Sequence, residues 1–245
     1  MKKLSKELKE IKVLLRSVPP LMLALFILSV VLMNLLANKS IDTGSWTWLA
    51  LDSGIVISWL SFLTMDMMVK RFGPKAATSI SIVAIVINLG VSLVFMVVSM
   101  IPGFWGESYV EVGGDLINRA LNNTISGTWY ILLGSTIAFL ASSVLNNILN
   151  HIIGKLLKKH SGTFLEYSMR SYLSTMIAQF ADNLIFAFIV SYNFFGWSII
   201  QCISCAATGA LVELVCEIIF SPIGYRVVRK WEKNGVGNEY LNLIK

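Results

Sequence analysis

The sequence predicts an all-α, polytopic membrane protein with six transmembrane helices. Apolar residues make up 56% of the chain and charged residues only 14%, whereas soluble domains average about 25% charged residues. Mean hydropathy is +0.71. Eighteen of the twenty Lys and Arg residues fall into five groups separated by long apolar stretches. A spanning helix needs about 20 mostly apolar residues, and six segments reach that length.

The chain divides into three predicted regions. Residues 1–18 form a cytoplasmic basic amphipathic segment, residues 19–228 the six-helix transmembrane domain, and residues 229–245 a cytoplasmic tail. In the first region apolar residues recur every three or four positions, at Leu4, Leu8, Ile11 and Leu15. This spacing is typical of a helix lying on the inner leaflet, although a solvated segment that only sets the topology would share its charge.

Each expected span is edged by Gly, Pro, Asn or charged residues. The spans cover residues 19–38, 46–69, 76–101, 127–150, 169–192 and 197–225. The first ends at Asn38 and Lys39, and the second ends at Lys70 and Arg71. The third is the clearest because it contains no charged residue, whereas the second, fifth and sixth carry acidic residues.

Charge in the connections predicts the topology. Basic residues precede span one, separate spans two and three and spans four and five, and follow span six. The positive-inside rule then puts both termini in the cytoplasm of a multi-pass protein of the cell (plasma or inner) membrane. The longest outer loop, about 102–126, is mainly acidic, and the amino-terminal segment lacks the short apolar core of a cleaved signal peptide.

Signatures of other function classes are missing from the sequence. There is no phosphate-binding G-x-x-x-x-G-K-[ST] loop and no G-x-S-x-G, and His151 and His160 form no paired metal motif. Three cysteines in the last span indicate packing rather than disulfides or metal. Basic residues are scattered over membrane-flanking loops, which predicts contact with lipid phosphate and no nucleic acid. We therefore expect no enzyme, no cofactor and no metal.

Polar side chains inside the spans are the functional candidates. The acidic ones are Asp66, Asp182, Glu213 and Glu217. An ionisable group at bilayer depth costs about 2.5–3.5 kcal/mol on insertion scales, so each is a candidate by default. The amides are Asn34, Asn88, Asn146, Asn147, Gln179, Asn183 and Gln201. Such amides either bind a ligand or only join helices.

Spacing groups these candidates. The fifth span carries one polar stripe at i, i+3, i+4 and i+7, formed by Gln179, Asp182, Asn183 and Phe186. Glu213 and Glu217 lie one turn apart and repel in a low dielectric, so at least one is protonated, paired or hydrated. Asp66 lies one turn before Lys70, so it either forms an ion pair at the membrane face or belongs to a site.

One segment carries a family resemblance. Residues 62–77, Phe-Leu-Thr-Met-Asp-Met-Met-Val-Lys-Arg-Phe-Gly-Pro-Lys-Ala-Ala, resemble the F-L-x-T-D-x-x-x-x-x-x-G-x-x-x-A signature of the queuosine-precursor transporter family, also called the vitamin-uptake-transporter-like family. Further blocks follow in the family's order: Asn34 and Asn38, Arg170-x-x-x-Ser174, Gln179-x-x-Asp182-x-x-x-Phe186, and the end of span six with Pro222. The chain departs from the family at Asn146-Asn147, where Asp is common, and near Glu217, where a Lys is common.

The resemblance implies a fold and a function. Members are six-helix inner-membrane proteins that import 7-deazaguanine bases, the 7-cyano or 7-aminomethyl form or queuine, for tRNA modification. Their fold is similar to that of the substrate-binding components of energy-coupling-factor vitamin transporters. The expected partners are thus a small-molecule 7-deazaguanine and the lipid bilayer.

The chemistry of such a base suits the candidate residues. A deazaguanine presents N1–H and a 2-amino group side by side, and a carboxylate accepts both. We expect Asp182 to be the main recognition group, with Glu213 as the alternative. Amides would contact O6, and Phe186, Trp59 or Tyr172 would stack on the ring. The expected substrate-binding residues are Asp182, Gln179, Asn183, Phe186, Glu213, Asn34 and Asp66.

Three function classes stay open at this stage. The first is an importer that works alone by alternating access, as a monomer or homodimer. The second is a binding component that docks on an energy-coupling module through small residues of the first span, of which Ala24 with Leu28 or Ser29 offers a weak version. The third is a membrane scaffold or sensor, in which the buried acids all pair internally. Uptake by vesicles that contain this protein alone separates the first two.

Overall fold

The structure is a computed structural model that describes residues 2–41, 43–46, 48–49, 51–106, 113–125, 129–158 and 162–244. It is all-α, with 84% of residues helical. The helices are α1 (Lys2–Ser17), α2 (Pro20–Leu36), α3 (Ile55–Phe72), α4 (Pro74–Met100), α5 (Gly114–Ile125), α6 (Trp129–Leu156), α7 (Phe164–Phe186), the π-helix η3 (Ala187–Tyr192), α8 (Ile199–Lys233) and α9 (Asn238–Leu243). The strands β1 (Ser40–Ile41) and β2 (Leu51–Asp52) pair antiparallel.

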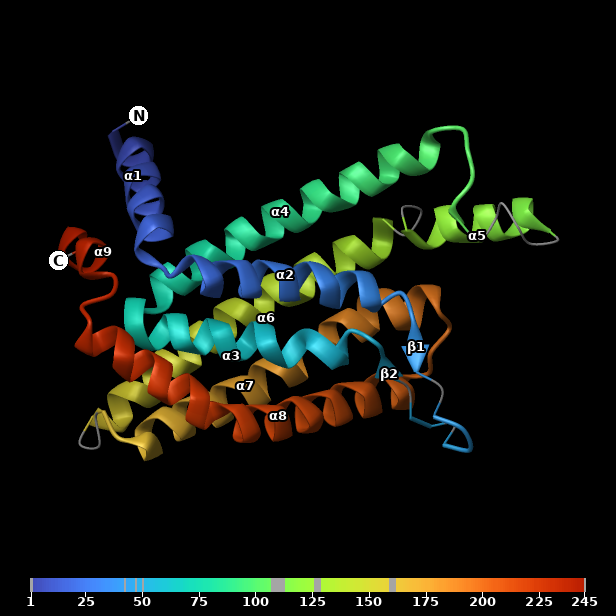
Figure 1. The fold of residues 1–245 in the computed structure, drawn as a ribbon. Coiled ribbons are helices and arrows are strands. Elements are labelled where there is room, and N and C mark those ends of the chain that lie inside the picture. Colours follow the sequence, from blue (N-terminus) through green and yellow to red (C-terminus); the bar gives the residue numbers. More distant parts are fainter. Residues whose placement is uncertain are drawn as a thin grey trace.

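The long helices pack side by side in a bundle, and α4 leans outward toward α5 (Figure 1). Both chain termini lie at one end of this bundle, with α1 and α9, which we call the terminal end. The β1–β2 hairpin lies at the opposite end, which we call the hairpin end.

Local sequence sets where the helices break. Pro19 and Pro20 separate α1 from α2, whose axes differ by 105°. Gly73, with a φ of 89°, ends α3, and Pro74 begins α4 at a position where its missing N–H costs nothing. At the start of α8 the Ser198 side chain accepts from the Gln201 backbone N–H in a capping box.

Helix α3 lies at the centre of the bundle, in contact with α2, α4, α6, α7 and α8. Eleven of its 18 residues are buried, Asp66 among them. Intramembrane charges are tolerated where they face the interior of a bundle rather than lipid. This central position lets α3 carry Asp66, Lys70 and Arg71 in one short helix.

The span count is lower than the sequence predicts. In the described residues four helical stretches are long and apolar enough to cross a membrane: α4, the stretch containing α6, α7 with η3, and α8. A fifth counts if bent α1 and α2 form one span. The stretch corresponding to the second predicted span, α3, is not among them, because its charged residues lower its hydropathy.

The hairpin replaces the first part of that second span. The sequence placed a helix from residue 46, but α3 begins at Ile55. Ser40 pairs with Asp52, and the Ser53 N–H donates to the Lys39 carbonyl at 2.7 Å. The chain thus reverses direction before α3, and Asp52 lies in strand β2 rather than in the predicted helix.

Candidate functional site

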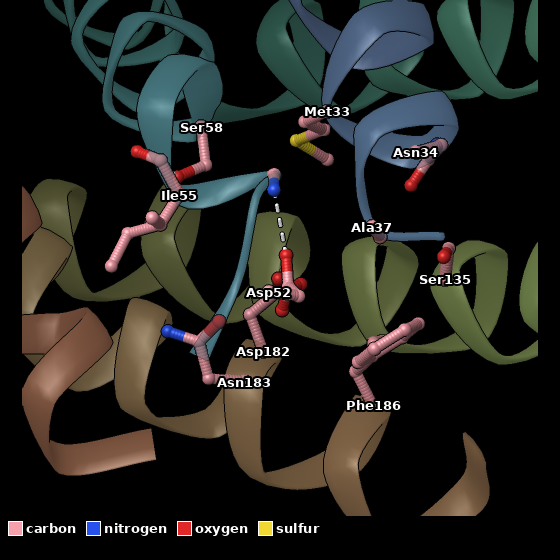
Figure 2. Close-up of a pocket in the computed structure, with 12 residues that line it drawn as sticks. Met33, Asn34, Ala37, Asp52, Ile55, Ser58, Ser135, Asp182, Asn183 and Phe186 are labelled. Atoms are coloured by element: carbon pink, nitrogen blue, oxygen red, sulfur yellow. Dashed lines mark hydrogen bonds between the residues drawn. The ribbon is translucent and has the colours of Figure 1, made fainter. Parts of the chain in front are cut away.

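A small cavity lies at the hairpin end, enclosed by α2, the hairpin, α3, α6 and α7 (Figure 2). Its volume is about 40 Å³, which holds about three waters at roughly 10–15 Å³ each. The lining residues are Met33, Asn34, Ala37, Asp52, Gly54, Ile55, Ser58, Ser135, Ala138, Asp182, Asn183 and Phe186. We call this the hairpin-end cavity.

Two carboxyl groups meet in this cavity from opposite walls. Figure 2 shows the carboxyl groups of Asp52, from β2, and Asp182, from α7, within the same lining. Asp52 Oδ1 accepts from the Gly54 N–H at 2.8 Å, and Asp182 Oδ1 accepts from Ser142 Oγ at 2.6 Å. The two aspartates interact electrostatically. Asp182 is therefore held by one hydroxyl, and Asp52 by backbone N–H groups.

A third carboxyl group lies behind the lining. Glu213 of α8 is buried, and one of its oxygens accepts from Ser58 Oγ, which itself lines the cavity. The other oxygen, Oε2, has no hydrogen-bond partner among the described residues. Glu213 interacts electrostatically with both Asp182 and Asp52. No Lys, Arg or His lines the cavity in the described part of the chain, so three acids share it without a cation.

Two glycines allow these side chains to approach. A Cβ at Gly54 would lie 2.7 Å from both Asp52 Oδ1 and the Met33 carbonyl oxygen. A Cβ at Gly209 of α8 would overlap the Asn183 amide, whose Nδ2 has no hydrogen-bond partner among the described residues. Larger residues at either glycine would displace a polar group that lines the cavity.

Asp52 is the one cavity acid that lies outside the helices. Burial raises its pKa from 3.8 to about 6, and hydrogen bonds from backbone N–H groups partly offset this effect. The side chain thus changes charge just below neutral pH. The groups that face it are Asp182, Glu213 and the Cys205 thiol.

A second polar group, which we call the terminal-end cluster, surrounds Asp66. The residue lies eight positions beyond Ser58 on α3, about 12 Å along the axis at 1.5 Å per residue. Asp66 accepts from Asn146 Nδ2 and Ser171 Oγ, both at 2.6 Å, and from Thr175 Oγ1 at 3.4 Å. It is fully buried and well supplied with donors.

This second cluster contains a cation. Lys70 Nζ donates to Ser171 Oγ at 2.9 Å and lies 3.3 Å from the centre of the Tyr167 ring. Lys70 also interacts electrostatically with Asp66 and Glu217. Ser171 therefore links Lys70 to Asp66, in place of the direct ion pair that the spacing allowed. Neither Glu217 oxygen has a hydrogen-bond partner among the described residues.

A polar cleft of about 290 Å³ borders the terminal-end cluster and is lined in part by Lys70 and Tyr167. Its other charges occur in pairs: Arg170 with Glu166 at 2.6 Å, and Arg229 with Glu232 at 2.8 Å. Each charged side chain that lines this cleft thus has an oppositely charged neighbour. The hairpin-end cavity has no such balance.

The predicted site residues divide between these regions. Asn34, Asp182, Asn183 and Phe186 line the hairpin-end cavity, and Glu213 lies one hydroxyl away. Asp66 belongs to the terminal-end cluster instead. Gln179 is fully buried on α7, outside the lining, and neither of its amide atoms has a hydrogen-bond partner among the described residues.

Two predicted stacking residues lie elsewhere. Trp59 stacks on Phe220 with ring centres 4.4 Å apart, and Tyr172 is hydrogen-bonded to Ser221 at 2.8 Å. Phe186 is the aromatic residue of the lining. Sequence reasoning missed Asp52, because it fell inside the predicted second span. The Asp-Ser-Gly turn signal just before the apolar run was the clue to its place.

Within the described residues no group of three His, Cys, Asp or Glu side chains is arranged to hold a metal ion. The cavity acids are instead spread over separate walls, each with one oxygen held by a donor of the protein. Such an arrangement suits an organic ligand that carries several N–H donors.

A family model described as "Putative vitamin uptake transporter" matches residues 52–227, which are 176 of the 245 residues. The chain belongs to this family. No curated protein and no solved structure matches the chain. Together with the apolar helices, membership of the uptake transporter family makes the chain a multi-pass membrane protein.

The matched region begins at Asp52 and contains α3 to α7, η3 and α8 as far as residue 227. Asp52, Asp66, Asp182, Glu213 and Glu217 lie within it, whereas Asn34 of α2 precedes it. The family match therefore includes these five acids and leaves out the part of the cavity lining that α2 supplies.

Proposed function

We propose that this transporter imports a 7-deazaguanine base, a queuosine precursor, and that Asp182 is its main recognition group. The observation that supports this proposal most directly is that the Asp182 carboxyl group lines a cavity in which the described chain places no cation. Burying an uncompensated charge is costly unless it is hydrogen-bonded. A ligand that supplies N–H donors removes that cost.

The guanine-type edge matches this acceptor. N1–H and the 2-amino group donate two parallel hydrogen bonds, which a carboxylate accepts in bidentate fashion. Adenine lacks this pair of donors and is disfavoured. Ser142 holds Asp182 Oδ1 at 2.6 Å and orients the group toward the cavity.

Neighbouring side chains complete the proposed site. The Asn183 amide Nδ2 now packs against Gly209 and has no hydrogen-bond partner in the described chain, and it would donate to O6 once the side chain turns into the cavity. Phe186 lines the same cavity and offers an aromatic face to the flat ring. Asn34, on the facing helix α2, is a second amide within the lining.

A base needs more room than about 40 Å³, so binding requires that the walls separate. The hairpin is the one wall that is not a helix. It is joined to α8 by a hydrogen bond that Ser204 Oγ donates to the Trp48 carbonyl oxygen at 2.8 Å. We infer that the structure represents an occluded state, and that hairpin displacement admits the base in an alternating-access cycle.

The proposed topology has six spans, with α3 as the charged central one and α1 on the inner leaflet. The terminal end is then cytoplasmic and the hairpin end faces outward. Lys75 and Glu10, 2.6 Å apart, join α4 to α1 at the proposed inner surface. The hairpin-end cavity therefore lies on the side from which an imported base arrives.

Reconstituted vesicles that contain this protein alone test the proposal. The wild type is expected to accumulate or exchange labelled 7-aminomethyl-7-deazaguanine. Asp182→Asn removes one acceptor and turns a donor toward N1–H, so uptake at low substrate should fall roughly 100-fold, the loss of two charge-assisted hydrogen bonds. Asp115→Asn, at an exposed position on α5, is the matched control and should leave uptake unchanged.

Uptake by Asp182→Asn at the wild-type rate would contradict the proposal. Binding that depends on Asp182 without any uptake would support the second function, a substrate-binding component of an energy-coupling-factor transporter. The structure offers little for that docking, since Ser29 is buried and donates to the Phe26 carbonyl at 2.8 Å, which leaves Ala24 exposed alone.

A further inference from the structure

The hairpin-end cavity holds more acceptors than one guanine edge can use. A bidentate contact occupies a single carboxylate, and Asp182 supplies it in the proposed function. Asp52, on the hairpin, lines the same cavity as Asp182 (Figure 2). On a neutral deazaguanine the donor that remains for a second carboxyl group is the pyrrole N9–H, whereas a 7-aminomethyl group adds an ammonium with three donors.

The described chain places no Lys, Arg or His among the three carboxyl groups of the cavity. Asp52 and Asp182 interact with each other and with Glu213, and the groups that act on these three carboxyls are hydroxyls, backbone N–H groups and other acids. A positive charge placed between the two aspartates would gain from both. A positive charge at this place would therefore come from the ligand.

Hydrogen-bond capacity points in the same direction. In the described chain Asp182 Oδ1 accepts from one hydroxyl, and the Asp52 carboxyl accepts only from backbone N–H groups, so neither is bound by a cation. An ammonium group has three donors and no acceptor. It fits a wall made of carboxyl oxygens better than a nitrile, which only accepts.

We propose that the cavity selects planar bases that carry a protonated amine: Asp182 binds the guanine edge and Asp52 binds the ammonium group of the 7-substituent. This inference rests on the proposed function and adds a substrate preference to it. The 7-aminomethyl form is favoured over the neutral 7-cyano form. Asp52 is a specificity-determining residue, carried into the site by the hairpin.

Acidification weakens this preference. With a pKa of about 6, Asp52 is mostly ionised at pH 7 and mostly neutral at pH 5. The groups that face it are Asp182 on α7, and Glu213 and Cys205 on α8, and none of these side chains carries a positive charge. Protonation of Asp182 would weaken both ligands, so the ratio of the two affinities is the informative quantity, and it falls from pH 7 to pH 5.

Calorimetric titration of the purified full-length protein with both compounds tests the inference. The wild type should bind the 7-aminomethyl form at least roughly tenfold more tightly, as one charge-assisted hydrogen bond provides. Asp52→Asn keeps an oxygen that can accept from Gly54 and should bring the ratio of the two affinities to about one. Asp52→Ser serves as a second variant of similar expected effect, and thermal melting confirms that both fold.

The outcomes separate the two proposals. Equal binding of both compounds by the wild type, or an equal loss of both in Asp52→Asn, overturns the cation preference and leaves the proposed function intact. Binding of neither compound by the folded wild type overturns the proposed function and the preference with it. Asp182→Asn should lose both compounds, which marks the shared recognition step.

Discussion

The hairpin-end cavity and the terminal-end cluster both contain buried acids, yet they differ in what surrounds the charge. Asp66 accepts three hydrogen bonds and lies near Lys70, which contacts the Tyr167 ring. Asp182 accepts one hydrogen bond and faces another acid. The protein itself supplies Asp66 with hydrogen bonds and a nearby cation, whereas it supplies Asp182 with one hydrogen bond and no cation in the described chain. An acid that a fold leaves uncompensated beside a cavity is the better candidate for ligand binding.

The first prediction concerns the terminal-end cluster and has the largest expected effect, a loss of stability. Asp66→Ala leaves the half-buried Lys70 without the acid that Ser171 links to it, and removing one partner of a buried charged pair costs up to about 3–5 kcal/mol of unfolding free energy. Adding Lys70→Met should recover much of that loss because the stranded charge is gone. Thermal melting in detergent measures both. A stable Asp66→Ala, or a double variant no better than the single one, would show that the cluster is not a linked unit.

The second prediction concerns the fit of the cavity. Gly209→Ala places a methyl group where the Asn183 amide lies, and that flexible side chain must turn away. Binding of the deazaguanine should weaken roughly tenfold, the value of one hydrogen bond to the base, with a smaller change in melting temperature. Gly90→Ala is the matched control, since nothing lies within 4 Å of its added Cβ. Equal binding by both variants would remove Asn183 from the site.

The third prediction has the smallest effect and concerns pH. Because the pKa of Asp52 is raised to about 6 in the folded state, its contribution to stability is fully present below about 3.8 and is lost as pH rises through 6. The ligand-free protein should therefore melt a few degrees lower at pH 7 than at pH 5, by roughly 2–4 °C per kcal/mol. Asp52→Asn should flatten this difference. An unchanged slope in the variant would assign it to other groups.

The sequence predicted the helical class and most helix positions because apolar length is a local property. The third span, expected at 76–101, is α4 at Pro74–Met100. The second span failed at its start, since 46–69 became a hairpin followed by α3 at Ile55–Phe72. Pairing between Ser40 and Asp52 is a tertiary event that no hydropathy window contains.

The sequence predicted the part of the candidate site whose residues lie on a single helix, α7. Helical spacing put Asp182, Asn183 and Phe186 on one face, and all three line the cavity. It could not separate Asp66 from them, because its distance from Asp182 depends on how α3 packs against α7. Asp52 was missed for the same reason: its role depends on a hairpin that folds over the bundle.

The most direct test removes the proposed contact from the ligand rather than the protein. 7-Deazahypoxanthine lacks the 2-amino group of 7-deazaguanine and is otherwise the same ring. Calorimetric titration of the wild type should show that this change weakens binding roughly tenfold or more, as the loss of a charge-assisted hydrogen bond requires. In Asp182→Asn the two bases should bind with nearly equal, weak affinity. The same loss in both proteins would mean that the 2-amino group is bound elsewhere and that Asp182 does not recognise the base.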